Sequence, residues 1–231
     1  NFRAGVNAGN SIASGGTFNV AVGDESGTAI TTGDHNVAVG YESLKTEDAH
    51  GHNTAVGSQA LKTLNAGADG KNTAVGAFAG KLMTEGVQNT LIGGLAGDAL
   101  THADFNTVVG YQALSADTFG HRSTAIGYSA LNAQNFASST NSNNTAVGYH
   151  SGLLVSTGIR NTIIGSEAGD ALTDADDNVA IGALALSADR KGNKSTAIGR
   201  GALKVQDFSG STDSNNTAVG YSAGESVTTG Q

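Results

Sequence analysis

Short apolar stretches of three residues recur along the chain, each preceded by a polar residue and followed by glycine. The clearest copies read Asn-Thr-Ala-Val-Gly and lie at residues 53–57, 72–76, 144–148 and 216–220. Thr and Val favour strands, and the flanking Asn and Gly are residues that commonly bound strands. The pattern therefore predicts one short strand in each repeat.

The glycine that closes each copy recurs at intervals of 17 to 21 residues. This interval suits one solenoid turn with one strand, because a repeat of two helices needs about 30 residues or more. We therefore expect an all-β fold, a parallel β-solenoid (β-roll) of about 13 coils of 17–21 residues. The closing glycines are Gly5, Gly23, Gly40, Gly57, Gly76, Gly93, Gly110, Gly127, Gly148, Gly165, Gly182, Gly199 and Gly220.

A longer period is superimposed on the coils. Four residues after the closing glycine, two coils with Gly alternate with two coils with Leu. Gly coils carry an apolar residue three positions later, such as Leu100, whereas Leu coils mostly carry a polar one, such as Asp117. We expect each coil to place one large apolar side chain in the close-packed interior. The array at 1–231 therefore consists of four-coil repeats at 6–76, 77–148 and 149–220, with a partial coil at 221–231.

The residue that opens the motif is nearly always Asn. Asparagines stacked at one per coil form a ladder in which each amide bonds the neighbouring coils. The predicted ladder comprises Asn19, Asn36, Asn53, Asn72, Asn89, Asn106, Asn144, Asn161, Asn178 and Asn216.

Alternate strand residues point to opposite faces. Consistently apolar positions such as Val22, Val56 and Ile126 suggest that Val/Ile and Thr face the interior. Asn, Ala and Gly then form a smooth outward stripe that suits close approach by another chain. A monomeric solenoid whose small residues only minimise bulk is the alternative.

Composition and charge narrow the function. The chain has 34 glycines, no proline or cysteine, and a net charge of −8, which argues against nucleic acid as a partner. No apolar run is long enough to span a membrane. His50 and His52, which could share a metal, and the acidic run from Asp170 to Asp177, which could bind calcium, are the candidate metal sites. A turn explains the histidines better, and the acidic run lacks the repeat of calcium-binding β-rolls. We therefore expect no metal, no cofactor and no catalysis.

Every fourth turn is long, at residues 61–72, 131–144 and 203–216. Solenoids often carry binding function on such loops, although tolerated insertions are the alternative. The candidate contacts for a host-surface receptor or glycan are Asn135, Phe136, Ser138, Thr140, Asn141, Asp207, Phe208, Ser211 and Asp213.

The motif Asn-Thr-Ala-Val-Gly, followed three residues later by Ala or Ser, resembles the head repeats of YadA-like trimeric autotransporter adhesins and related phage and bacterial fibre arrays. The resemblance covers the whole chain. It implies left-handed β-rolls that associate side by side as a homotrimer, and a role in attachment to surfaces, matrix or host cells.

We therefore expect an extracellular or surface-exposed fibre segment, without catalysis. The chain opens with the motif and stops where the next Asn would begin, so we expect a slice of a longer array. The alternative is an ice-binding β-solenoid, which requires the opposite face assignment, with Thr54, Thr73, Thr90, Thr107 and Thr124 in an outward row.

Overall fold

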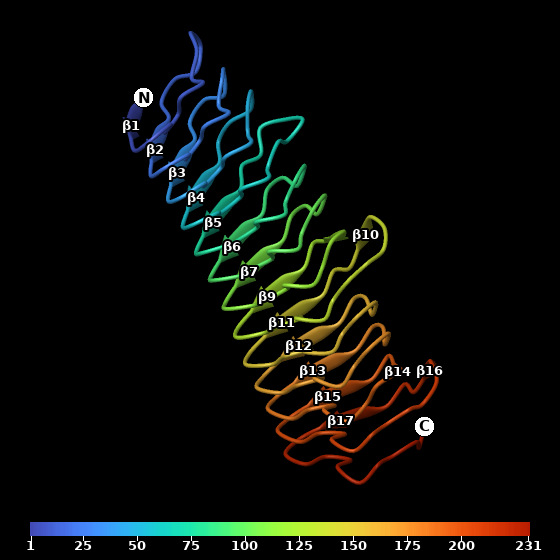
Figure 1. The fold of residues 1–231 in the computed structure, drawn as a ribbon. Helices are drawn as coiled ribbons and strands as arrows, with labels where there is room; N and C mark the ends of the chain where they lie inside the picture. The colour runs from blue at the N-terminus through green and yellow to red at the C-terminus, as the bar shows by residue number, and fades with distance from the viewer. The chain divides into compact units, whose positions relative to one another are not determined.

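The computed structural model describes all 231 residues and contains only strands, turns and bends. It divides into an N-terminal unit, residues 1–112, and a C-terminal unit, residues 113–231. Each unit is a stack of coils with one short strand per coil (Figure 1). The chain is thus an all-β, parallel β-solenoid of about thirteen coils, as the repeat predicts. No helix is present, and hence none that could cross a membrane.

The N-terminal unit contains seven parallel strands that pair in chain order. The register aligns equivalent residues of the motif, so that Thr54 pairs with Thr73 and Val56 with Val75. The strands are β1 (Phe2–Ala4), β2 (Val20–Val22), β3 (Val37–Val39), β4 (Thr54–Val56), β5 (Thr73–Val75), β6 (Thr90–Ile92) and β7 (Thr107–Val109).

The C-terminal unit contains six strands of the same kind, again parallel and in register. They are β9 (Thr124–Ile126), β11 (Thr145–Val147), β12 (Thr162–Ile164), β13 (Val179–Ile181), β15 (Thr196–Ile198) and β17 (Thr217–Val219). Two further pairs of two-residue strands each join a long turn of this unit, at 131–144 or 203–216, to a turn of the preceding coil. They are β8 (Gly120–His121) with β10 (Thr140–Asn141), and β14 (Gly192–Asn193) with β16 (Thr212–Asp213).

Each strand ends at the closing glycine, where the backbone leaves the extended conformation of the strand. Gly165, for example, has a φ of +135°, a backbone conformation that residues with a side chain rarely adopt. A Cβ atom at Gly165 would also lie 2.6 Å from the carbonyl carbon of Gly182 in the next coil. Close stacking of the coils therefore requires glycine at this point.

The face assignment expected from the sequence is wrong. The middle residue of the strand, usually Ala, is the one that faces the interior, and Ala55 and Ala146 are 0% exposed. The flanking Thr and Val/Ile residues are half-buried or exposed. The middle position also holds larger residues in some strands, since Leu91 and Ile163 are 0% exposed as well.

Most of the large core side chains come from the two positions that the four-coil pattern predicted, and Leu91 and Ile163 come from the middle of strands β6 and β12. Leu114 and Leu131 are fully buried in Leu coils, and Leu100 and Leu172 are fully buried in Gly coils. Leu114 and Leu131 have a φ of +50°, and the glycines at the equivalent position of the Gly coils, such as Gly97 and Gly169, have a similar φ. This left-handed backbone costs a residue with a side chain about 1–2 kcal/mol, and burial of the leucine side chain offsets that cost.

The asparagine ladder is present, but it faces inward. Asn161 Oδ1 accepts a hydrogen bond of 3.0 Å from the Asn178 backbone N–H, and Asn161 Nδ2 donates one of 2.7 Å to the Ala175 carbonyl. Each amide therefore binds mainly the backbone of the next coil rather than the next amide. Asn216, near the end of the chain, is half-buried, whereas the other predicted ladder residues are buried: Asn19, Asn36, Asn53, Asn72, Asn89, Asn106, Asn144, Asn161 and Asn178.

Candidate functional site

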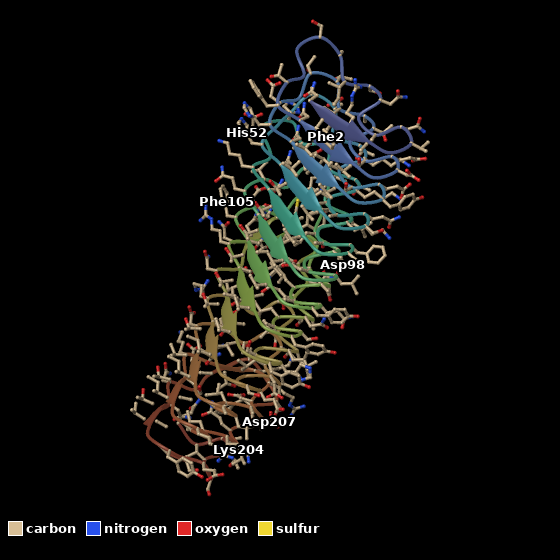
Figure 2. All side chains as sticks on the ribbon, turned by 90° about the vertical axis from the view of Figure 1, so that its left-hand side faces the viewer. Phe2, His52, Asp98, Phe105, Lys204 and Asp207 are labelled. Carbon is tan, nitrogen blue, oxygen red and sulfur yellow. The ribbon has the colours of Figure 1, made fainter.

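The most extensive candidate surface is the outer strand face, which we define as the first and third residues of the three-residue strands. The first residue is Thr in most strands, and the third is Val or Ile in all strands except β1. These side chains carry no charge. Ile92 is 40% exposed and Ile164 is 37% exposed, and Val219 reaches 67%. Within each unit the strands lie side by side, and Phe2 lies on the first strand of the N-terminal unit (Figure 2).

Tyrosines follow the closing glycine in several coils and extend this surface. Tyr128 and Tyr149 stack with ring centroids 5.5 Å apart, and His150 lies 3.8 Å from Tyr149 by the same measure. Each of the two tyrosines is almost half exposed. The C-terminal unit thus carries aromatic side chains directly after strands β9 and β11.

The long turns divide into an inner and an outer part. Phe136 is 5% exposed and Phe208 is 6% exposed, so neither ring can contact a receptor as the sequence suggested. A fully buried carboxylate also holds the backbone at each phenylalanine: Asp117 accepts a hydrogen bond from the Phe136 N–H, and Asp189 accepts one from the Phe208 N–H. Thr140 and Asp207 are half-buried, and the exposed candidates are Asn135, Ser138, Asn141, Ser211 and Asp213.

Ion pairs and hydrogen bonds already occupy several polar groups of these turns. Asp207 accepts two hydrogen bonds of 2.9 Å from the guanidinium of Arg190. Asp213 accepts one of 2.5 Å from Lys194, which lowers the pKa of that carboxyl. A receptor would therefore meet a polar surface in which the acidic groups are neutralised by the preceding coil.

The acidic run does not converge on one point. Asp177 forms a two-bond ion pair with Arg160, and Asp174 lies 3.3 Å from Lys191 Nζ. The carboxylate of Asp176 accepts the backbone N–H of Ile159 instead. These three carboxylates thus have separate partners, whereas Asp170 Oδ1 is buried without a hydrogen-bond partner, and the four do not come together as one group of metal-ligating atoms.

The two histidines also make different contacts. The His52 ring stacks on His35 with centroids 5.0 Å apart, on the edge of the N-terminal unit that also carries Phe105 (Figure 2). The His50 Nδ1 atom instead lies 3.7 Å from Glu47 Oε1. The metal-ligating side chains that the structure brings together are Glu47, Asp48 and His50. The sequence did not predict this group, since neither His52 nor the acidic run from Asp170 to Asp177 belongs to it.

The chain was compared with family models, curated proteins and solved structures, and none of them matches. The structure also contains no pocket.

Proposed function

We propose that this chain is a structural and adhesive segment of an extracellular or surface-exposed fibre, built as a side-by-side homotrimer. The observation that carries the proposal is the outer strand face, an uncharged surface of Thr, Val and Ile that continues from strand to strand within each unit. Monomeric soluble proteins rarely expose contiguous apolar patches above a few hundred Å². Association of three copies through this face removes the Val and Ile side chains from water.

The outer strand face replaces the Ala/Gly stripe that the sequence suggested as the subunit contact, because the alanines are buried inside each coil. The exposed polar tips of the long turns, around Ser138 and Ser211, stay outside such a contact and are available to a host or surface ligand. Regular coils supply length and stiffness, and the turns supply recognition.

Sedimentation equilibrium tests the trimer. We expect the chain to have three times its mass of 22.9 kDa. Ile164→Lys places a charge in the outer strand face, so it should shift the mass to that of a single chain. Ser138→Lys adds the same charge at an exposed turn and should leave the trimer intact. A wild-type mass of 22.9 kDa would exclude this proposal.

Ice binding is the second candidate function, and one specific observation favours it. Thr54, Thr73, Thr90 and Thr107 lie on the outer strand face, at equivalent positions of successive strands. Successive strands are about 4.8 Å apart, so the hydroxyls form a regular row beside Val and Ile. A thermal-hysteresis assay distinguishes the two functions: a monomer that depresses the freezing point supports ice binding, and a trimer without hysteresis excludes it.

A further inference from the structure

The three four-coil repeats offer an internal comparison around one buried acidic residue. Glu47, Asp117 and Asp189 occupy the same position, seven residues after a closing glycine, and each is 0% exposed. In the second and third repeats a glutamine of the next coil donates a hydrogen bond of 2.6 Å to the carboxylate. In the first repeat that glutamine is replaced by Leu64, so Glu47 lacks this partner.

A second difference occurs at the same place. Three residues after the acidic residue the later repeats have Gly120 and Gly192, and the first repeat has His50. The glutamine is therefore lost in the repeat that gains a histidine. Both differences bear on the same carboxylate.

The remaining hydrogen bonds of Glu47 are long. Its Oε1 accepts the His50 backbone N–H at 3.2 Å, and its Oε2 accepts the Ala66 backbone N–H at 3.3 Å, at or beyond the long end of the usual range. The His50 Nδ1 atom is buried and has no hydrogen-bond partner. Burial also raises the pKa of Glu47. The buried Glu47 carboxylate thus has only long hydrogen bonds, and the nearby His50 Nδ1 atom has none.

The spacing of these atoms fits a shared cation. Glu47 Oε1 and His50 Nδ1 are 3.7 Å apart, which is too long for a hydrogen bond. Two ligand atoms on one tetrahedral Zn²⁺, each about 2.1 Å from the metal, are held about 3.4 Å apart. Asp48 supplies a third ligand atom, and all three ligand atoms lie within 4.8 Å of one another. The His50 side chain is 32% exposed, so an ion can enter from solvent.

We propose that Glu47, Asp48 and His50 bind a divalent first-row transition metal of the Zn²⁺ type. One imidazole and two carboxylates are suited to such an ion, whereas Ca²⁺ and Mg²⁺ favour all-oxygen sites. The three residues leave one position of a tetrahedral ion for water. The metal gives the Glu47 carboxylate a partner within its own coil, whereas the equivalent carboxylates of the later repeats bind a glutamine of the next coil.

Isothermal titration calorimetry of the full chain with ZnCl₂ tests the site. We expect saturable uptake of one Zn²⁺ per chain, at least about tenfold weaker in His50→Gln. The matched control is His52→Gln, which changes an exposed histidine outside the cluster and should bind as the wild type does. Asp48→Asn alters a half-buried ligand and should also weaken binding. Circular dichroism in EDTA checks that each variant is folded.

Nitrogen-15 NMR of the histidine rings gives a readout that is independent of affinity. Zn²⁺ should shift the Nδ1 resonance of His50 and leave the ring nitrogens of His52 unchanged. Uptake that survives in His50→Gln but is lost in His52→Gln, or no saturable uptake at micromolar Zn²⁺, would overturn the proposal.

Discussion

Gln134 Nε2 donates a hydrogen bond of 2.6 Å to Asp117 Oδ2, seventeen residues earlier in the chain, and both side chains are fully buried. Asn144 Nδ2 in turn donates one of 2.8 Å to Gln134 Oε1. The donors therefore all point the same way, from Asn144 through Gln134 to the carboxylate. Gln206 repeats the arrangement with Asp189 and Asn216. This relay links the ladder asparagine to the turn of an adjacent coil.

Replacement of Gln134 by Leu should destabilise the protein. It leaves Asp117 Oδ2 and Asn144 Nδ2 with fewer partners, and a buried polar group without a partner costs about 1–3 kcal/mol. We expect the free energy of unfolding to fall by about 2–4 kcal/mol, measured by urea denaturation. Gln88→Leu is the control, because Gln88 is exposed and should tolerate the change. Equal stability of the two variants would refute the role of the relay.

Much of the fold could be predicted from the sequence because the repeat constrains it. The closing glycines fix the coil length, and the alternation of Gly and Leu fixes which wall supplies the large side chain, as in Leu131 and Leu172. The face assignment could not be predicted in the same way. In Thr145-Ala146-Val147 both faces offer apolar residues, so alternation alone does not decide which face is inside, and the structure places Ala146 there.

The candidate site was predictable only in part. The sequence places Phe136 in a long turn, which suggests an exposed ring. In the structure the buried Asp117 accepts a hydrogen bond from the Phe136 backbone N–H, and the ring is buried. The signal for the Glu47 cluster was present in the repeat, because Leu64 and His50 both depart from their counterparts. Both departures are visible when equivalent positions of the three repeats are aligned, whereas the spacing of His50 and His52 does not point to Glu47.

Removal of a ladder asparagine should cost more than removal of an exposed one. Asn161→Ala leaves the Asn178 N–H and the Ala175 carbonyl without their partner. We expect the free energy of unfolding to decrease by about 2–4 kcal/mol, since two buried groups lose a hydrogen bond. Asn65→Ala, at an exposed position, should change it by less than about 0.5 kcal/mol. Amide hydrogen exchange should show loss of protection at Asn178; unchanged protection there would contradict the ladder.

In a Gly coil, the glycine four residues after the closing glycine should not be replaceable even by alanine without loss of stability. Gly152 has a φ of +58°, and a Cβ there would lie 2.9 Å from Ile163 Cδ1 and 3.0 Å from Leu131 Cδ2. The backbone strain alone is about 1–2 kcal/mol, and the contacts add to it. We expect Gly152→Ala to lower the thermal midpoint clearly. In Gly210→Ala the new methyl group meets nothing within 4 Å, so a comparable loss there would rule out this explanation.

Acid should remove a stabilising contribution that Glu42 makes at neutral pH. Hydrogen bonds from Lys45 and Lys62 hold the pKa of Glu42 at about 2, below its ordinary value of 4.5. A carboxyl whose pKa is lower in the folded state stabilises the fold above its unfolded pKa, and this stability is lost as the pH falls through the folded pKa. Glu42→Gln removes the charge and should lower the thermal midpoint at pH 6. The difference in thermal midpoint between wild type and variant should shrink between pH 4.5 and pH 2.

Thermal melts across this pH range, followed by circular dichroism, measure this difference. Glu225→Gln is the control, because Glu225 is a half-buried residue outside this cluster. A gap between wild type and Glu42→Gln that stays constant down to pH 2 would show that the lysines do not stabilise the fold through this carboxylate.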